Sequence, residues 1–195
     1  GLTLIKLNAR GDKTFFHFLD EAASNDYRSW YPASTVKFVA AVLAAKRLSD
    51  LGFENADNIN ITFHYSEGEQ NRTWKDLIDK ALRPSKNMPY NELVILGGHA
   101  LITKFLIGHG YDIALNKPYL KTAWKKLTGL NPASLPSYKH TFAGCRITVT
   151  DTVTNKTETI PAARAGSYRL DTSRSSSCST KALAEFLSDF VINNT

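Results

Sequence analysis

One stretch limits the fold more than any other. Residues 29–48, "SWYPASTVKFVAAVLAAKRL", join a polar head to a strong apolar helix signal. Apolar side chains recur there at helical spacing from Val36 to Leu43, and nearly every face of the helix is apolar. Such a helix belongs in the core of a protein. Ser34 and Lys37 stand at its head, so we expect them to be held rigidly at the edge of that core.

The composition is that of a globular protein. The chain has 195 residues, of which 43% are hydrophobic, enough for one substantial core. It has no run of about eighteen uncharged apolar residues, so we expect no membrane span. The chain opens on Gly1 and its only methionine is Met88, which indicates a processed or trimmed N-terminus. Cys145 and Cys178 allow one disulfide, and equally two unpaired thiols.

The formal net charge of +6 allows an acidic partner. The sharpest basic feature is the four-residue spacing of Lys117, Lys121 and Lys125, which predicts one lysine-bearing helix face. No aromatic platform or nucleic-acid motif accompanies it. A solvated helix face is therefore the favoured interpretation, and no nucleic-acid partner is expected. A basic interaction module remains a rival hypothesis.

The remaining elements predict a mixed α+β fold. Strands at 2–7 and 13–19 form an opening hairpin that turns at Gly11, and the stretch 61–74 is interpreted as a loop-rich crossing segment. Helices follow at 73–82, with Thr73 as N-cap, and twice within 89–110. A Thr- and Val-rich hairpin at 146–160 turns near Asn155, and Ser179 or Thr180 caps a last helix.

Ser34 and Lys37 have the spacing of a nucleophile and its base. Residues three apart on a helix face the same way, so the hydroxyl and the amine can meet across one turn. Serine is a poor nucleophile until a base takes its proton, and burial lowers the pKa of a lysine enough to make it that base. The first helical turn also favours an oxyanion. The structural alternative is an N-cap serine beside a lysine that reaches out of the core.

A second motif, "SKNMPYNELVILGG", begins at Ser85 and places Ser85, Asn87 and Asn91 before an apolar helix that ends in a glycine pair. "PASTVK" followed by this motif resembles the serine β-lactamase and penicillin-binding protein superfamily, and is most similar to the class A type. The resemblance implies a single β-lactamase-like domain over 1–195, with a helical lobe of roughly 50–135 packed on an antiparallel sheet. The sheet would take strands from 1–30, with 144–165 as a further candidate, and would be incomplete or rebuilt.

Carried over by position, the resemblance makes Ser34 the acylated nucleophile and Lys37 the proton acceptor. Ser85 would relay a proton to the leaving nitrogen, and Asn87 would hold the substrate and Lys37. A second hydroxyl beside Lys37 would keep the moving proton out of solvent. The structural alternative for Ser85 and Asn87 is a loop that caps the following helix.

Three features depart from the family. Lys86 stands where the class A type has Asp. No Lys-Thr-Gly occurs, and its nearest imitation is Arg164 to Ser167 in "ARAGSY". The deacylating loop has only a weak counterpart in "DIALN", Asp112 to Asn116. The chain therefore looks shortened at its C-terminus relative to the family, and the acyl-enzyme would be long-lived.

The leading hypothesis is a serine hydrolase that acts by acyl transfer on a β-lactam or a related amide or ester, with a small-molecule or peptidoglycan-like substrate. The alternative is a penicillin-recognising sensor or an inert binding protein of the same fold. The resemblance implies a periplasmic or secreted location. The five histidines show no metal-ligand spacing, so no metal or other cofactor is expected. They are His17, His64, His99, His109 and His140.

Overall fold

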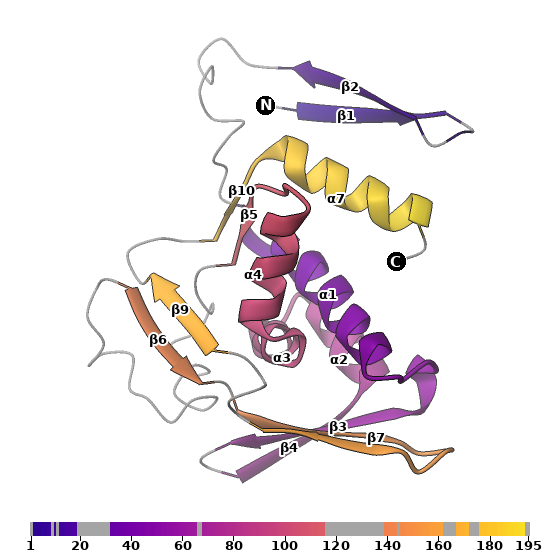
Figure 1. Cartoon of the computed structure of the whole chain (residues 1–195), viewed down its shortest axis with the longest axis vertical. Coiled ribbons are helices and arrows are strands. Elements are labelled where there is room, and N and C mark those ends of the chain that lie inside the picture. The colour runs from indigo at the N-terminus through magenta and orange to yellow at the C-terminus, as the bar shows by residue number, and fades with distance from the viewer. Residues whose placement is uncertain are drawn as a thin grey trace.

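The computed structural model describes residues 2–8, 10, 12–18, 32–65, 68–115, 139–143, 145–161, 167–171 and 176–193. These residues form an α+β fold, in which helices occupy the middle and antiparallel strands lie at both ends of the long axis (Figure 1). The lysine-bearing helix expected from Lys117 to Lys125 lies outside the described residues, and so does most of "ARAGSY".

The helical layer begins with the apolar segment of residues 29–48. A 3-10 turn, η3 (Ala33–Thr35), leads into α1 (Val36–Asp50). It is followed by α2 (Trp74–Leu82), α3 (Asn87–Gly97) and α4 (His99–Gly108). The expected helices are confirmed, and Thr73 caps α2 because its hydroxyl accepts the Asp76 amide at 3.0 Å.

α1 and α3 run side by side in the same direction. Lys37 contacts Asn87 where both helices begin, and Nη1 of Arg47 donates to the Leu96 carbonyl toward their ends, at 3.1 Å. Nearly every residue of α3 is buried. The two helices thus form the centre of the core, as an apolar helix requires.

A four-stranded antiparallel sheet covers one side of the helices (Figure 1). Its order is β4 (Gly68–Thr73), β3 (Ile59–Tyr65), β7 (Arg146–Asp151) and β8 (Thr157–Ile160). A short turn, η4 (Ala56–Asn58), precedes β3. Alternate side chains of the two central strands point into the core, and the buried set is Ile59, Ile61, Phe63, Tyr65, Ile147 and Val149.

This sheet corrects two expectations. The stretch 61–74 is the β3–β4 hairpin and the start of α2, not a loop-rich crossing. The expected helical lobe of 50–135 therefore contains this hairpin as well as helices. β4 was missed because it carries polar side chains on both faces. The hairpin of β7 and β8, confirmed with its turn at Asn155, pairs with β3 and not with the opening strands. The sheet candidates 1–30 and 144–165 therefore belong to separate sheets.

At the other end of the molecule, the opening hairpin of β1 (Leu2–Leu7) and β2 (Lys13–Phe18) is confirmed. It lies beside α7 (Thr180–Asn193), where Lys13 pairs with Asp189 (Figure 1). Ser179 caps α7, since its hydroxyl accepts the Ala182 amide at 3.0 Å. Two short pairs complete the strands: β5 (Ile113–Ala114) with β10 (Ser177–Cys178), and β6 (Lys139–Ala143) with β9 (Ser167–Asp171).

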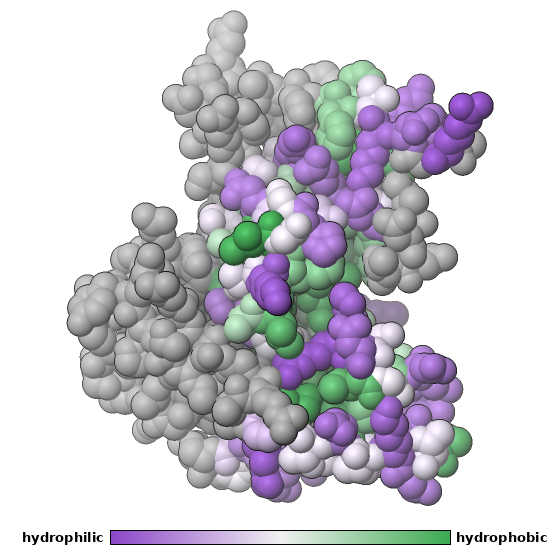
Figure 2. All heavy atoms as spheres, viewed as in Figure 1, coloured by the Kyte–Doolittle hydropathy of each residue, from purple (hydrophilic) through white to green (hydrophobic). Residues whose placement is uncertain are grey.

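Both cysteines are buried free thiols, so the structure does not contain the disulfide that the sequence allows. Burial raises the pKa of Cys145 to about 12 and that of Cys178 to about 11, which makes both thiols poor nucleophiles. Within the described part of the chain, no helix is long and apolar enough to cross a membrane. Figure 2 shows apolar surface in separate patches, interrupted by hydrophilic side chains.

The β7–β8 turn is tied to the end of α1 by Lys156. Its Nζ donates to the carbonyls of Leu51 at 2.6 Å and Gly52 at 2.9 Å, and lies 4.7 Å from the centre of the Phe53 ring. Carbonyls at a helix C-terminus lack intrahelical partners and attract a cation. This contact fixes the hairpin against the helical layer.

We expect Lys156→Met to lower the free energy of unfolding by about 1 kcal/mol, because it removes two charge-assisted hydrogen bonds at an exposed site. Urea denaturation measures the change. Lys46→Met is the matched control, since Lys46 makes only an exposed pair with Asp50 and its loss should cost less than about 0.5 kcal/mol. Equal effects in the two variants would contradict the role given to Lys156.

Candidate active site

The structure joins three of the four predicted site residues by hydrogen bonds. Nζ of Lys37 lies 3.0 Å from Oγ of Ser85 and 2.9 Å from Oδ1 of Asn87, and it also donates to the Ser85 carbonyl. Lys37 comes from the first turn of α1, Ser85 from the connection between α2 and α3, and Asn87 from the first turn of α3. Two segments about fifty residues apart thus meet at one amine.

Lys37 is buried to an unusual degree for a lysine, with 1% of its surface exposed. Burial lowers its pKa from the ordinary lysine value. Two of its partners are carbonyl oxygens, which only accept hydrogen bonds, while the Ser85 hydroxyl can also donate one. These oxygen atoms replace the water that the amine loses on burial, in its charged as in its neutral form.

Ser34, the predicted nucleophile, is exposed and lies three residues before Lys37, in the 3-10 turn that leads into α1. The spacing places both residues on one side of the helix start. The hydroxyl of Ser34 is thus at the surface, while the amine of Lys37 is in the core. No side chain caps the first turn of α1, which leaves its amide groups to other acceptors.

Backbone strain gathers at this site. Ala33, directly before Ser34, has a φ of 45°, and Ser85 has a φ of 55°. Residues with a Cβ rarely adopt such angles, which cost about 1 to 3 kcal/mol each and persist only where the surroundings enforce them. Among the described residues, only Asn155 in the β7–β8 turn is a further non-glycine residue with positive φ. Strain of this kind is concentrated at functional sites.

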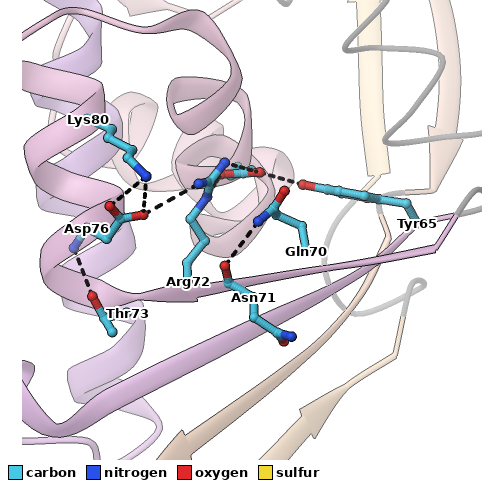
Figure 3. Close-up of polar contacts among 8 residues, drawn as sticks. Tyr65, Gln70, Asn71, Arg72, Thr73, Asp76 and Lys80 are labelled. Carbon is cyan, nitrogen blue, oxygen red and sulfur yellow. Dashed lines mark hydrogen bonds and ion pairs between the residues drawn. The ribbon is translucent and has the colours of Figure 1, made fainter.

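A buried ion network holds α3 in place. The Glu92 carboxylate is fully buried and accepts hydrogen bonds from Nε of Arg72 at 2.7 Å, from Nη2 of Arg72 at 3.2 Å, and from the Tyr65 hydroxyl at 2.6 Å. Figure 3 shows Arg72 and Tyr65 converging from the hairpin, with Asp76 and Lys80 continuing the network along α2. The β3–β4 hairpin is thereby fixed to the helix that carries Asn87.

Sequence reasoning missed this network and the strain at Ala33. The signal for the network was Glu92 itself, because a carboxylate inside the apolar run of α3 requires a buried partner. The identity of that partner was not readable, since Arg72 lies in the segment taken for a loop. The strained φ of Ala33 has no signature in its residue type.

The remaining candidates lie elsewhere. Asp112 is exposed beside the β5–β10 pair, and Asn116 lies outside the described residues. Lys86, which departs from the family pattern, is exposed at the start of α3. His64 and His99 bond Glu69 and the Leu115 carbonyl, respectively. The described residues hold no group of three or more His, Cys, Asp or Glu side chains that could bind a metal ion.

No family model, curated protein or solved structure matches the chain.

We expect Glu92→Gln to lower the free energy of unfolding by about 3 kcal/mol, because it leaves the Arg72 guanidinium without its buried counter-charge. Chemical denaturation measures the loss. Asp79→Asn is the matched control, since Asp79 makes an exposed pair with Arg83 at 3.5 Å and should contribute little. A change in Glu92→Gln as small as that of the control would show that the network does not hold α3.

Proposed function

We propose that this protein is a serine hydrolase of the β-lactamase-like fold, acting by acyl transfer on a β-lactam or a related amide or ester. The observation that carries the proposal is the buried Lys37 amine, held between two helices by Ser85 and Asn87. A lysine that serves only for solubility or surface pairing has no reason to be buried against neutral oxygen atoms. A proton acceptor beside a serine has that reason.

The chemistry assigns one step to each side chain. Lys37 takes the proton of the Ser34 hydroxyl while Oγ forms a bond to the substrate carbonyl carbon. The carbon–nitrogen or carbon–oxygen bond of the substrate then breaks, and the Ser85 hydroxyl passes the proton from Lys37 to the leaving atom. Water later cleaves the acyl–Ser34 ester, which releases the acid and restores the serine. Asn87 orients Lys37 and one edge of the substrate.

Two further features support an acyl-transfer site. The oxyanion that develops on the carbonyl oxygen is favoured near the positive end of α1, whose first turn has no side-chain cap. The strained φ of Ala33 holds Ser34 in a turn that an unstrained chain would not adopt. A nucleophile held in one conformation loses little entropy on reaction.

The substrate we propose is a small molecule or a peptidoglycan-like amide, and the location is periplasmic or secreted, as the resemblance implies. The alternative function is a penicillin-recognising sensor or an inert binding protein. The observation that favours it is the lack of a Lys-Thr-Gly motif in the sequence. Without an efficient deacylating group, such a protein would keep its acyl group or never acquire one.

Intact-mass spectrometry after incubation with a penicillin tests the proposal. We expect a mass increase equal to one penicillin molecule in the wild type and none in Ser34→Ala, because Ser34 supplies the attacking oxygen. Ser49→Ala is the matched control, since Ser49 is exposed at the far end of α1 and should leave the adduct unchanged.

The time course then separates the two functions. An adduct that forms and disappears, with penicilloate released, identifies a hydrolase, while a stable adduct identifies a sensor or a penicillin-binding protein. If Ser34→Ala forms as much adduct as the wild type, the assignment of Ser34 as the nucleophile is overturned. If neither a penicillin nor an activated ester is hydrolysed by the wild type or leaves an adduct on it, the protein acts on a different acyl substrate or has lost its chemistry.

The pH dependence of acylation tests the role of Lys37. Burial lowers the pKa of Lys37 from 10.5, so its neutral form becomes available at lower pH than in an ordinary lysine. We expect the acylation rate to rise with pH along a limb whose midpoint lies below 10.5. Stopped-flow or quenched mass measurements give the rates. A rate that falls or stays constant between about pH 6 and pH 10 would contradict a lysine base.

A further inference from the structure

One buried polar side chain has no hydrogen-bond partner. Asn91, in the middle of α3, is 2% exposed, and neither its Nδ2 nor its Oδ1 is bonded to any group. These are the only buried side-chain nitrogen or oxygen atoms left without a partner in the described part of the chain. Asn91 belongs to the second motif, yet the acyl-transfer scheme gives it no step.

An amide buried without partners is costly. Each unpaired donor or acceptor costs about 1 to 3 kcal/mol, because the group loses its bonds to water and gains none in the protein. Folded proteins therefore pair nearly all such groups, and ordered water supplies the partner where protein atoms do not. Two unpaired atoms on one side chain indicate that a polar group completes this position in the folded protein.

The position of Asn91 along α3 limits which groups can bond its amide. It lies one helical turn after Asn87, on the face of α3 that meets α1. The helices approach closely toward their ends, since a Cβ added to Gly97, six residues after Asn91, would lie 3.4 Å from the backbone nitrogen of Ala44. The buried α1 residues between Lys37 and Ala44 include Ala40 and Ala41, whose methyl groups leave the α1 backbone near α3.

We propose that Asn91 binds an internal water molecule between α1 and α3. Water is the smallest group that both donates and accepts, which is what an amide lacking both kinds of partner requires. A carbonyl of α1 can accept a second hydrogen bond with its free lone pair and so complete the water's partners. The residues of α1 that are buried after Lys37 are all apolar, so their side chains offer no polar group of their own.

Polar side chains then continue from the surface into the core, from exposed Ser34 through Lys37 and Asn87 to Asn91, and the water is the last member of this series. It fixes the register of the two helices that hold Lys37. The inference stands on the burial and lack of partners of Asn91, and it holds whether or not Ser34 is acylated.

A pair of crystal structures at a resolution that shows ordered water, wild type and Asn91→Leu, tests the inference. We expect a water within about 3.2 Å of Nδ2 or Oδ1 in the wild type and none in the variant. We expect Asn91→Leu to lower the folding equilibrium constant about fivefold to tenfold, because the water and its α1 partner lose their bonds. Asn60→Leu, at an exposed position of β3, is the control for replacing an asparagine by leucine.

Two results would overturn the inference. The Asn91 amide could be bonded directly to a protein group in the crystal, or its surroundings could hold no water. In the second case Asn91→Leu would raise the folding equilibrium constant, since leucine has no polar group to leave unpaired. If the variant does not fold, the wild-type structure alone decides between these results.

Discussion

The structure depends on one buried amine. Lys37 lies in the core at the start of α1, and a lysine can be buried only where oxygen atoms replace its hydration. Those oxygen atoms come from Ser85 and Asn87, at the start of α3. The need to satisfy one side chain therefore sets where α3 begins and how it lies against α1.

The other layers hold this pairing in place. α3 is fixed from its far side by the ion network of Glu92, Arg72 and Tyr65, which ties it to the β3–β4 hairpin. That hairpin is completed by β7, and Lys156 joins the β7–β8 turn back to the end of α1. The four-stranded sheet carries no predicted catalytic group, but it restrains both α1 and α3. Strain at Ala33 and Ser85 is tolerated because these surroundings are rigid.

The sequence predicted what local patterns control. Local signals predicted helices that the structure confirms, because such signals act within a few residues. They are the apolar period of α1, the Thr73 cap of α2 and the glycines around α4. The β3–β4 hairpin was missed since β4 is polar on both faces, and the pairing of β3 with β7 joins strands about eighty residues apart. Local periodicity contains no information on partners so distant in the chain.

The site was predictable only in part. Ser34 and Lys37 follow from helical spacing, while the place of Ser85 and Asn87 came from a resemblance and is compatible with the hydrogen bonds to Lys37. Nothing in the residue types indicated the positive φ of Ala33 or the missing partners of Asn91. Both arise from packing between elements that are distant in the sequence, so no single segment indicates them.

The titration of Lys37 itself tests whether this residue is the base. NMR of protein labelled with carbon-13 at the lysine side chains, with Lys37→Met to assign the signal, gives its pKa beside those of the other lysines. We expect a midpoint below 10.5 and a chemical shift that responds to the loss of the Ser85 hydroxyl in Ser85→Ala. A midpoint at or above the ordinary lysine value would mean that Lys37 stays charged, and would contradict the proposed chemistry.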